Sequence, residues 1–363
     1  MRTSFITGFP NFLAVTMARE VLAEHPKNQA RLLVQGKHLG AWEEFRRLLP
    51  ESHRKRAHAY TGDVVDMDLG LSGDEYAEIA DTADYIFHLA GVYWMATDPQ
   101  EAYRVNVEGT AEMLRLAKEC TRLRRFAYFS TAFVSGDRTG VILEEDLEAG
   151  QKFRNAFEET RFRAERLVRR HLDQLPISIF RPSIVVGHSV TGEIDRITGP
   201  YFLMNAIVNW PVDVPIPLPG RGDAPMNLVP VDFVVSAARL LTGDPRSEGR
   251  TFHLTDPNPL PARRVFELVA RAAGRRAPRG QLPSRTVRRL LSLPGLRRGA
   301  TDQRHFLEYF DQVVIWRGVN TLNLLSGSTV QCPPFESYVD VLVDQLKARS
   351  EGRVITMTES ETK

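Results

Sequence analysis

Cysteine and long apolar runs are what this 363-residue sequence has least of. Its two cysteines, Cys120 and Cys332, define neither a disulfide framework nor a metal site. No apolar stretch approaches the roughly 18 residues that a membrane-spanning helix needs. The first strand begins almost at the first residue with no small-residue cleavage site after it, so no secretory signal is expected. These absences predict a cytoplasmic protein with no bound metal.

An excess of charge of one sign is also missing from the chain as a whole. Lysine and arginine number 47 and the acids 45, while 43% of the residues are hydrophobic, as in an ordinary globular protein. The exception is the segment 263–304, which holds twelve arginines against Glu267 and Asp302. Arg263–Arg304 predicts a surface for an acidic carrier protein or a membrane, with peripheral membrane attachment as one outcome. A solvated helical face explains the pattern equally well.

Nucleic acid is not an expected partner of this segment. Phe266 is its one aromatic residue, and no recognised nucleic-acid-binding motif is present. The spacing of histidines, cysteines and acids also supports no metal site or nucleophile triad. The oligomeric state is left open by the sequence.

Glycine is scarce where a phosphate-binding turn needs it. An apolar pair at residues 5–6 leads into a turn at Gly8, and a helical pattern follows over residues 12–22. A strand, a glycine turn and a helix open a dinucleotide-binding unit, whose helix N-terminus holds the pyrophosphate. The three positions that are usually glycine are occupied here by Gly8, Asn11 and Ala14. Alanine is accepted at the third position, but Asn11 predicts an altered phosphate site.

Apolar segments and helical patterns alternate along the rest of the chain. Beyond the first, strands are expected at residues 31–35, 57–62, 84–88, 125–129, 177–180 and 226–229. Long helical stretches are expected at about 105–119 and 155–171. Strands joined by crossover helices predict an α/β fold, with a doubly wound parallel sheet and ligands at the carboxyl ends of the strands.

An acidic residue is missing at the end of the second strand. In an NAD-binding unit an Asp or Glu about twenty residues after the glycine turn accepts a hydrogen bond from the ribose 2′-hydroxyl. This chain has Gln35 and Lys37 there. The absence of an acid and the nearby cation favour NADP over NAD. A lysine that is merely solvated is the alternative interpretation.

Seven short segments in a fixed order carry a family resemblance over roughly residues 3–256. They are Thr7-Gly8, Gly62-Asp63 with residues 69–72, residues 88–91, 106–110, 130–132, 181–183 and Val231-Asp232. With these segments the chain resembles the extended short-chain dehydrogenase/reductases, which include the nucleotide-sugar epimerases. It looks most like the branch that contains fatty acyl-CoA reductases and thioester-reductase domains.

The resemblance implies a Rossmann-type domain and a smaller region beside it. The Rossmann domain would span residues 1–256, with a substrate-side insertion at about 182–225. Residues 257–347 would form a smaller C-terminal substrate or lid region, and residues 348–363 a disordered tail. NADP would be the cofactor, with NAD as the alternative, and the substrate would be a small acyl or aldehyde-type molecule.

The resemblance also implies a set of site residues. Those expected to hold the dinucleotide are Thr7, Gly8, Asn11, Phe12, Leu13, Asp63, Val64, Ala90, Gly91, Arg161 and Pro182. Asp63 would lie by the adenine, and Ala90 and Gly91 along the dinucleotide. Four more residues complete the expected site: Thr131 as the substrate-binding hydroxyl, Asn106 in a structural and proton-relay role, and Tyr93 and Tyr201 in the substrate pocket.

The catalytic pair is where the sequence departs from the family. The family carries a tyrosine general acid/base and, four residues later on the same helix face, a lysine that lowers its pKa. Phe157 and Arg161 occupy these two places. Phenylalanine has no proton to transfer, and arginine, with a pKa above about 12, is a poor substitute for lysine. Ordinary family chemistry is therefore not expected.

Three functions remain open. In the first, a degenerate member keeps the fold and the dinucleotide while its redox catalysis is weakened or lost; changes at two working parts favour this interpretation. In the second, an active NADPH-dependent reductase has reassigned its catalytic residues. Its proton could then come from Thr131, Tyr93, Tyr128 or His188. In the third, the protein is a non-catalytic regulator or scaffold.

Overall fold

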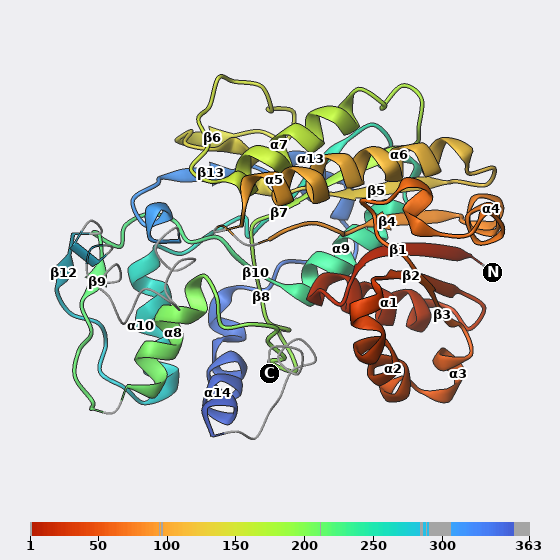
Figure 1. Cartoon of the computed structure of the whole chain (residues 1–363). Coiled ribbons are helices and arrows are strands. Elements are labelled where there is room, and N and C mark those ends of the chain that lie inside the picture. The colour runs from red at the N-terminus through yellow and green to blue at the C-terminus, as the bar shows by residue number, and fades with distance from the viewer. Residues whose placement is uncertain are drawn as a thin grey trace.

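The computed structural model describes residues 2–93, 95, 97–210, 212–283, 286, 287, 289 and 306–351. Its centre is a seven-stranded sheet in the order β11-β7-β5-β4-β1-β2-β3, with every neighbouring pair parallel. Helices cover both faces of this sheet (Figure 1). The seven strands are β1 Thr3–Phe9, β2 Gln29–Val34, β3 Ala57–Thr61, β4 Tyr85–His88, β5 Arg125–Phe129, β7 Ile177–Pro182 and β11 Thr251–Leu254. The predicted doubly wound, Rossmann-type sheet is confirmed.

Two hydrophobic cores lie against the two faces of the sheet. In the first core, apolar side chains of α1, α2, α9 and α13 pack against one face of the sheet. In the second core, apolar side chains of α4, α6 and α7 pack against the other face. The first set of helices is α1 Phe12–Glu24, α2 Leu39–Leu48, α9 Val231–Gly243 and α13 Val319–Leu325. The second set is α4 Gly73–Thr82, α6 Gly109–Glu119 and α7 Ala156–Arg169, with the short α5 Pro99–Tyr103 and the π-turn Arg104–Glu108 leading into α6.

A third hydrophobic core lies beside the sheet, where α8, α10 and α14 pack together (Figure 1). These helices are α8 Pro200–Asn209, α10 Ala262–Ala273 and α14 Val339–Ser350. Three short parallel pairs border it: β8 Ile184–Val186 with β10 Leu228–Pro230, β9 Leu218–Pro219 with β12 Gln281–Leu282, and β6 Gly140–Ile142 with β13 Val314–Trp316. The predicted division into a domain over 1–256 and a lid over 257–347 stays a prediction, because residues before 256, including α8, belong to this third core.

The strand expected at 226–229 is present as β10, which pairs with β8 outside the central sheet, whereas β11, the seventh strand of the central sheet, was not expected from the sequence. One expectation about the end of the chain differs from the structure. The final helix α14 extends to Ser350, past the expected start of the tail at residue 348. Residues 352–363 of that tail lie outside the described residues. Within the described ranges, no helix has the length and apolar character needed to cross a membrane.

Candidate functional site

A large cleft runs along the carboxyl ends of the central strands. It brings together ten of the residues predicted from the sequence to form the site: Gly8, Asn11, Phe12, Leu13, Asp63, Val64, Ala90, Gly91, Tyr93 and Tyr201. It is also lined by residues 184–187 after β7 and by the loop residues 195–196 and 198–200, which were not predicted individually as site residues. Their sequence signal was the expected substrate-side insertion at about 182–225.

The glycine turn at the head of α1 is closely built against the end of β4. Gly8 has a φ of +97°, and a Cβ there would lie 2.6 Å from the Leu89 carbonyl, so no other residue fits. Asn11 caps α1, since its Oδ1 accepts from Ala14 N at 2.8 Å and its Nδ2 donates to Leu89 O at 3.0 Å. The Asn11 amide therefore stabilises the turn and occupies the Ala14 N–H, while the N–H groups of Phe12 and Leu13 have no acceptor among the described residues and could meet an anion.

The opposite end of the cleft is polar and carries a cation. Gln35 Nε2 donates to Asp63 Oδ2 at 2.7 Å, and Val65 N donates to Asp63 Oδ1 at 3.3 Å. Lys37 and His38 line the same part of the cleft. Asp63 is thus held in place by the end of β2, where its neighbour is an amide rather than an acid, and its expected position by the adenine stays a prediction.

A buried hydrogen-bond chain supports the wall of the cleft. Thr110 Oγ1 donates to Asn106 O at 2.6 Å, so it accepts from His88 Nε2 at 3.1 Å, and this nitrogen carries the hydrogen. His88 Nδ1 therefore accepts from Thr7 Oγ1 at 2.8 Å, and Thr7 Oγ1 in turn accepts from Ala90 N at 3.1 Å. Burial, with the nearby Arg161 charge, lowers the pKa of His88 to about 3. The imidazole is therefore neutral across the physiological pH range.

Asn106 holds the loop after β4 in place. Its Oδ1 accepts from Val92 N at 2.9 Å, and its Nδ2 donates to Thr160 Oγ1 at 2.8 Å. Asn106 is completely buried and does not line the cleft. Its contacts agree with a structural task, while the predicted proton-relay role stays a prediction.

The side chains in the family's catalytic places lie behind the wall of the cleft. The ring of Phe157 packs on Tyr93 with centroids 6.5 Å apart, and the Arg161 guanidinium lies 4.7 Å from the Tyr93 centroid. Arg161 is 1% exposed, and a Cβ on Gly91 would fall 1.9 Å from its Nη2. Neither Phe157 nor Arg161 lines the cleft, which Gly91 and Tyr93 border in front of them, and the expected contact of Arg161 with the dinucleotide stays a prediction.

Arg161 is poorly satisfied for a buried cation. Its Nη1 donates to Phe129 O at 3.1 Å, whereas its Nε and Nη2 have no hydrogen-bond partner. The Tyr128 hydroxyl is likewise buried without a partner, and burial raises the pKa of Tyr128 to about 12. Polar atoms left unpaired in a protein interior are rare and need an explanation.

The remaining predicted residues, Thr131 and Pro182, lie at strand ends but do not line the cleft. Thr131 Oγ1 accepts from Phe133 N at 3.3 Å and caps the turn that follows β5. Pro182 ends β7. His188, a candidate proton donor, accepts from Val190 N in an exposed turn. The roles of these residues stay predictions.

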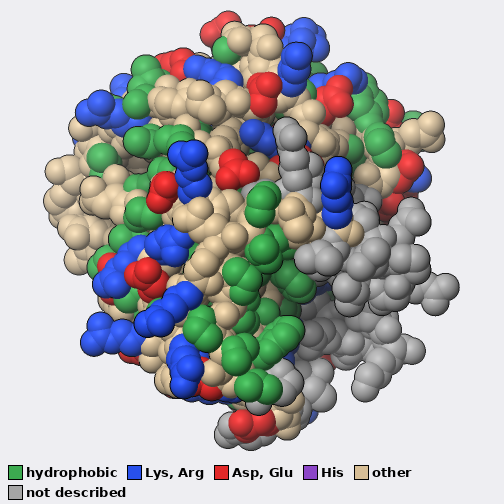
Figure 2. Space-filling model, turned by 90° about the vertical axis from the view of Figure 1, so that its left-hand side faces the viewer, with side chains coloured by type: hydrophobic (Ala, Val, Ile, Leu, Met, Phe, Trp, Pro, Cys, Tyr) green, Lys and Arg blue, Asp and Glu red, His purple; other side chains and the backbone are tan. Residues whose placement is uncertain are grey.

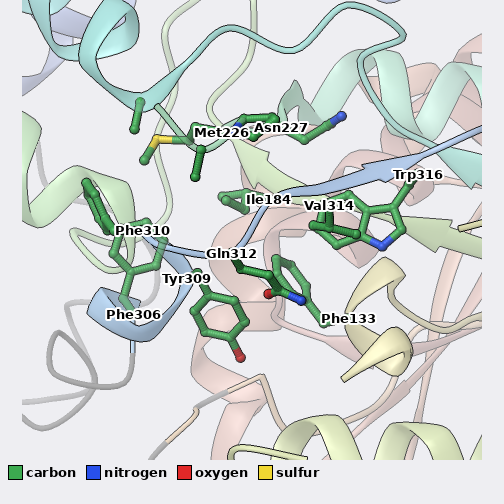
Figure 3. A pocket seen from close by; sticks show the side chains of 13 residues that line it. Phe133, Ile184, Met226, Asn227, Phe306, Tyr309, Phe310, Gln312, Val314 and Trp316 are labelled. Carbon is green, nitrogen blue, oxygen red and sulfur yellow. The ribbon is translucent and has the colours of Figure 1, made fainter. Parts of the chain in front are cut away.

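A small apolar pocket adjoins the cleft, and Ile184 lines both (Figure 3). Phe157 belongs to the same hydrophobic cluster as its wall residues Phe133 and Trp316. Tyr309 turns its ring to the pocket and its hydroxyl away, donating to Glu158 Oε1 at 2.5 Å (Figure 3). The lining residues are Phe133, Ile184, Ala224, Pro225, Met226, Asn227, Ala262, Phe306, Tyr309, Phe310, Gln312, Val314 and Trp316. Sequence reasoning missed this pocket because its residues come from segments far apart in the chain.

The face that carries α8 and α10 combines apolar and basic side chains (Figure 2). Between α8 and β9, Trp210, Val212 and Val214 are exposed. Arg276, at 68% side-chain exposure, pairs with Asp213 of the same stretch at 3.4 Å. Much of the arginine-rich segment predicted to bind an acidic partner, residues 284–285, 288 and 290–305, lies outside the described residues. Within those that are described, no group of three or more His, Cys, Asp or Glu could hold a metal ion.

The parallel sheet, the Gly8 turn and the cleft define a Rossmann-type protein of the extended short-chain dehydrogenase/reductase class. The sequence matches the family model described as Male sterility protein, of the NAD-binding type, over residues 6–238. Since this match covers more than half of the chain, the protein belongs to that family, and the resemblance seen in the sequence is confirmed.

Curated relatives carry reductase names. A putative fatty acyl-CoA reductase of Drosophila melanogaster is 24% identical over 65% of this chain and 51% of its own length. The aldehyde reductase lnbA of Aspergillus flavus is 28% identical over 70% of this chain and 26% of its own length. The chain thus spans about half of the fly relative and about a quarter of the fungal one.

Solved structures show the same architecture. The terminal R domain from the myxalamid PKS-NRPS biosynthetic pathway superposes with a TM-score of 0.83 at 26% identity, over 97% of this chain and 92% of that one. UDP-glucuronic acid 4-epimerase from Bacillus cereus, solved with NAD, superposes with a TM-score of 0.71 at 15% identity, over 96% of this chain and 98% of that one. The second likeness supports the fold alone.

Proposed function

We propose that the protein binds a nicotinamide dinucleotide, NADP in preference to NAD, and that its redox catalysis is weakened or lost. The observation that carries the second part is Phe157 in the tyrosine place, packed on Tyr93 with no hydroxyl to offer. The dinucleotide would supply a hydride, so this chain's residues would have to bind the dinucleotide, orient it and protonate the reduced substrate. The cleft supports the first two of these tasks, and Phe157 does not support the third.

The cleft fits the parts of a dinucleotide in order. The tight turn at Gly8 and the free N–H groups of α1 suit a pyrophosphate. Asp63 and Lys37 lie at the end where the adenosine would bind, and Lys37 would pair with a 2′-phosphate. Gly91 and Tyr93 lie toward β5, on the far side of the switch in strand order, where the nicotinamide half belongs. The Arg161 guanidinium, enclosed behind Gly91 and Tyr93, would bring a positive charge close to this half of the cleft.

A replacement proton donor is not ready beside Phe157 in the described structure. The hydroxyl of Tyr93 donates to Leu89 O at 2.7 Å, and Thr131 Oγ1 is held by the turn after β5. Tyr128 is sealed in the interior. Because a positioned general acid contributes roughly 10²–10⁴ in rate, a reductase step here would be slower by about that factor.

The substrate we propose is a small acyl or aldehyde-type molecule. Two relatives are named as fatty acyl-CoA and aldehyde reductases. The part of the large cleft that Tyr93, Ile184 and Tyr201 line would receive such a molecule. The face bearing Trp210 and Arg276 would meet an acidic carrier protein or a membrane surface.

An active reductase with reassigned residues is the second candidate. The reductase names of the relatives favour it. Turnover of NADPH with an aldehyde by the unmodified protein would select it over the degenerate interpretation. A protein that binds neither NADPH nor NADH would instead be a non-catalytic regulator or scaffold.

Titration of the purified chain with NADPH and NADH, followed by nicotinamide fluorescence, tests the proposal. Saturable binding with no oxidation of the cofactor in the presence of aldehydes is the expected result. Lys37→Ala should weaken NADPH binding roughly tenfold and leave NADH unchanged, because only NADPH carries the 2′-phosphate. Lys118→Ala, an exposed lysine on α6, is the matched control. Equal binding of both cofactors to wild type and Lys37→Ala would refute the preference for NADP.

A further inference from the structure

Arg161 is a buried cation whose charge nothing in the described structure balances. Within the described residues its one hydrogen bond goes to the carbonyl of Phe129, and no carboxylate pairs with it. Its guanidinium lies between the ring of Tyr93 and the backbone of Gly91, which lines the cleft. A guanidinium stays protonated inside proteins, so the positive charge is permanent.

The groups around Arg161 do not supply a negative charge. His88 and Tyr128 are neutral at physiological pH, since burial lowers the pKa of His88 to about 3 and raises that of Tyr128 to about 12. Glu165, one turn further along α7, is held by Arg181 at 2.6 Å and Arg169 at 3.0 Å. The neighbourhood therefore has a net positive charge, and it is the interior that meets the nicotinamide end of the cleft.

Because Phe157 and Arg161 replace the family's tyrosine and lysine, the positive charge at this place cannot be neutralised by loss of a proton. A tyrosine and a lysine can share it, because the phenol can lose its proton and leave a compensating phenolate. Phe157 cannot ionise, and Arg161 cannot lose its proton. The site thus presents the same cation to whatever form of the cofactor enters it.

We infer that the cleft discriminates the oxidation state of its cofactor and binds the reduced dinucleotide in preference to the oxidised one. This rests on the proposed dinucleotide binding. The oxidised nicotinamide ring carries a positive charge that Arg161 repels, whereas the reduced ring is uncharged. With an effective dielectric constant of about 20, two charges several ångströms apart repel enough to change affinity on the order of tenfold or more. Cofactor occupancy would then follow the ratio of reduced to oxidised dinucleotide.

Such a preference also shifts the redox poise of the bound cofactor. Each tenfold tighter binding of the reduced form raises the reduction potential of the bound couple by about 30 mV, since two electrons are transferred. A protein with this property and no efficient proton donor is suited to sense reduced cofactor. The paired loss of tyrosine and lysine would then create a function as well as remove one.

Calorimetric titration of the full chain with NADPH, NADP⁺, NADH and NAD⁺ at one ionic strength tests the inference. Wild type should bind each reduced form at least tenfold more tightly than its oxidised partner. Arg161→Met should bring the two affinities within about twofold, and Arg161→Lys, which keeps the charge, should retain the preference. Arg163→Met, on the exposed face of α7, should leave the ratio unchanged.

The outcomes separate this inference from the proposed function. Binding of no dinucleotide would overturn the proposed function and the inference with it. Tight but equal binding of reduced and oxidised forms by wild type would overturn the inference alone. A preference that persists in Arg161→Met would also overturn it, because the source of the selectivity would lie elsewhere. If Arg161→Met does not fold, the wild-type ratio and Arg161→Lys still decide.

Discussion

Two arginines, Arg161 and Arg181, are each 1% exposed, yet their surroundings differ completely. Arg181 donates to Glu165 through Nε at 3.0 Å and Nη2 at 2.6 Å, and Nη2 also reaches Asp146 O at 2.8 Å. Arg161 reaches a single carbonyl oxygen. Arg181 has a structural role, because its guanidinium nitrogens all donate to acceptors within the protein. Arg161 leaves two donor nitrogens without an acceptor among the described residues.

Each arginine has a neutral, buried histidine beside it, and these differ in the same way. Beside Arg181, the His253 Nδ1 donates to Arg317 O at 3.1 Å and its Nε2 accepts from Arg181 Nη1 at 3.2 Å. Beside Arg161, the His88 ring bonds only to threonines and leaves the guanidinium alone. Burial and residue type are thus identical in the two regions. Among the described residues the two regions differ in how completely the buried guanidinium is hydrogen-bonded.

The largest expected effect converts the Arg161 region into an ordinary catalytic site. The double variant Phe157→Tyr with Arg161→Lys should create or raise NADPH-dependent reduction of long-chain aldehydes or acyl thioesters by roughly 10²–10⁴. The reason is that a restored phenol beside a lysine can donate a proton. Loss of NADPH absorbance with an aldehyde or an acyl thioester measures the rate.

Phe162→Tyr with Arg163→Lys, the neighbouring positions on α7, provides the control for this variant. Phe162 packs on Phe153 away from the cleft, so no gain is expected. A fall in an existing activity of the Phe157/Arg161 double variant would show that these residues serve reassigned chemistry. No change, with the cofactor bound, would mean that the proposed substrate class is wrong.

The next effect concerns folding stability. Arg181→Met leaves the buried Glu165 short of its main partner and should lower the free energy of unfolding by about 3–5 kcal/mol. Arg161→Met removes a charge that has no partner, so the change should stay within about 1 kcal/mol and could be stabilising. Urea unfolding of both variants measures the difference. Similar losses in the two variants would show that Arg161 is as structural as Arg181.

The sequence was a good guide to the central sheet. The strands at the centre of the sheet are buried on both faces, so they form largely apolar segments between helical patterns, as at residues 85–87 and 126–129, whereas the edge strand β3 is partly exposed. The strand expected at 226–229 is present, but a short apolar run shows that a strand exists and not which strand it joins. In the structure β10 joins β8, and β11 completes the sheet.

The candidate site was predictable only in part. Gly8, Asp63 and Gly91 could be placed because the spacing of the family's segments fixes them along the strand ends. The burial of Arg161 behind Tyr93 could not be predicted from the sequence, because it depends on the packing of a loop against a helix about 70 residues away. The contact of Tyr309 with Glu158 joins segments 151 residues apart and leaves no local pattern.

The smallest expected effect is a pH dependence that compares the two arginine regions directly. The pKa of His88 and that of His253 are both lowered to about 3 in the folded protein, chiefly by burial. In the unfolded chain a histidine titrates near 6.5. Below that pH the unfolded state takes up protons that the folded state refuses, so stability is full at neutral pH and falls as the pH drops toward 3. Each histidine should account for about 1.4 kcal/mol of the loss at pH 5.5.

Replacing each histidine by an amide isolates its share. His88→Asn keeps an acceptor for Thr7, and His253→Gln keeps one for Arg181. Urea unfolding measures how far the free energy of unfolding decreases between pH 7.5 and pH 5.5. This decrease should be smaller by about 1.4 kcal/mol in each variant than in wild type. If His88→Asn changes this pH-dependent decrease less than His253→Gln does, the Arg161 region admits water, as an open ligand site would. If neither variant differs from wild type, the two histidines are not sealed in the interior, and the parallel between the two regions fails.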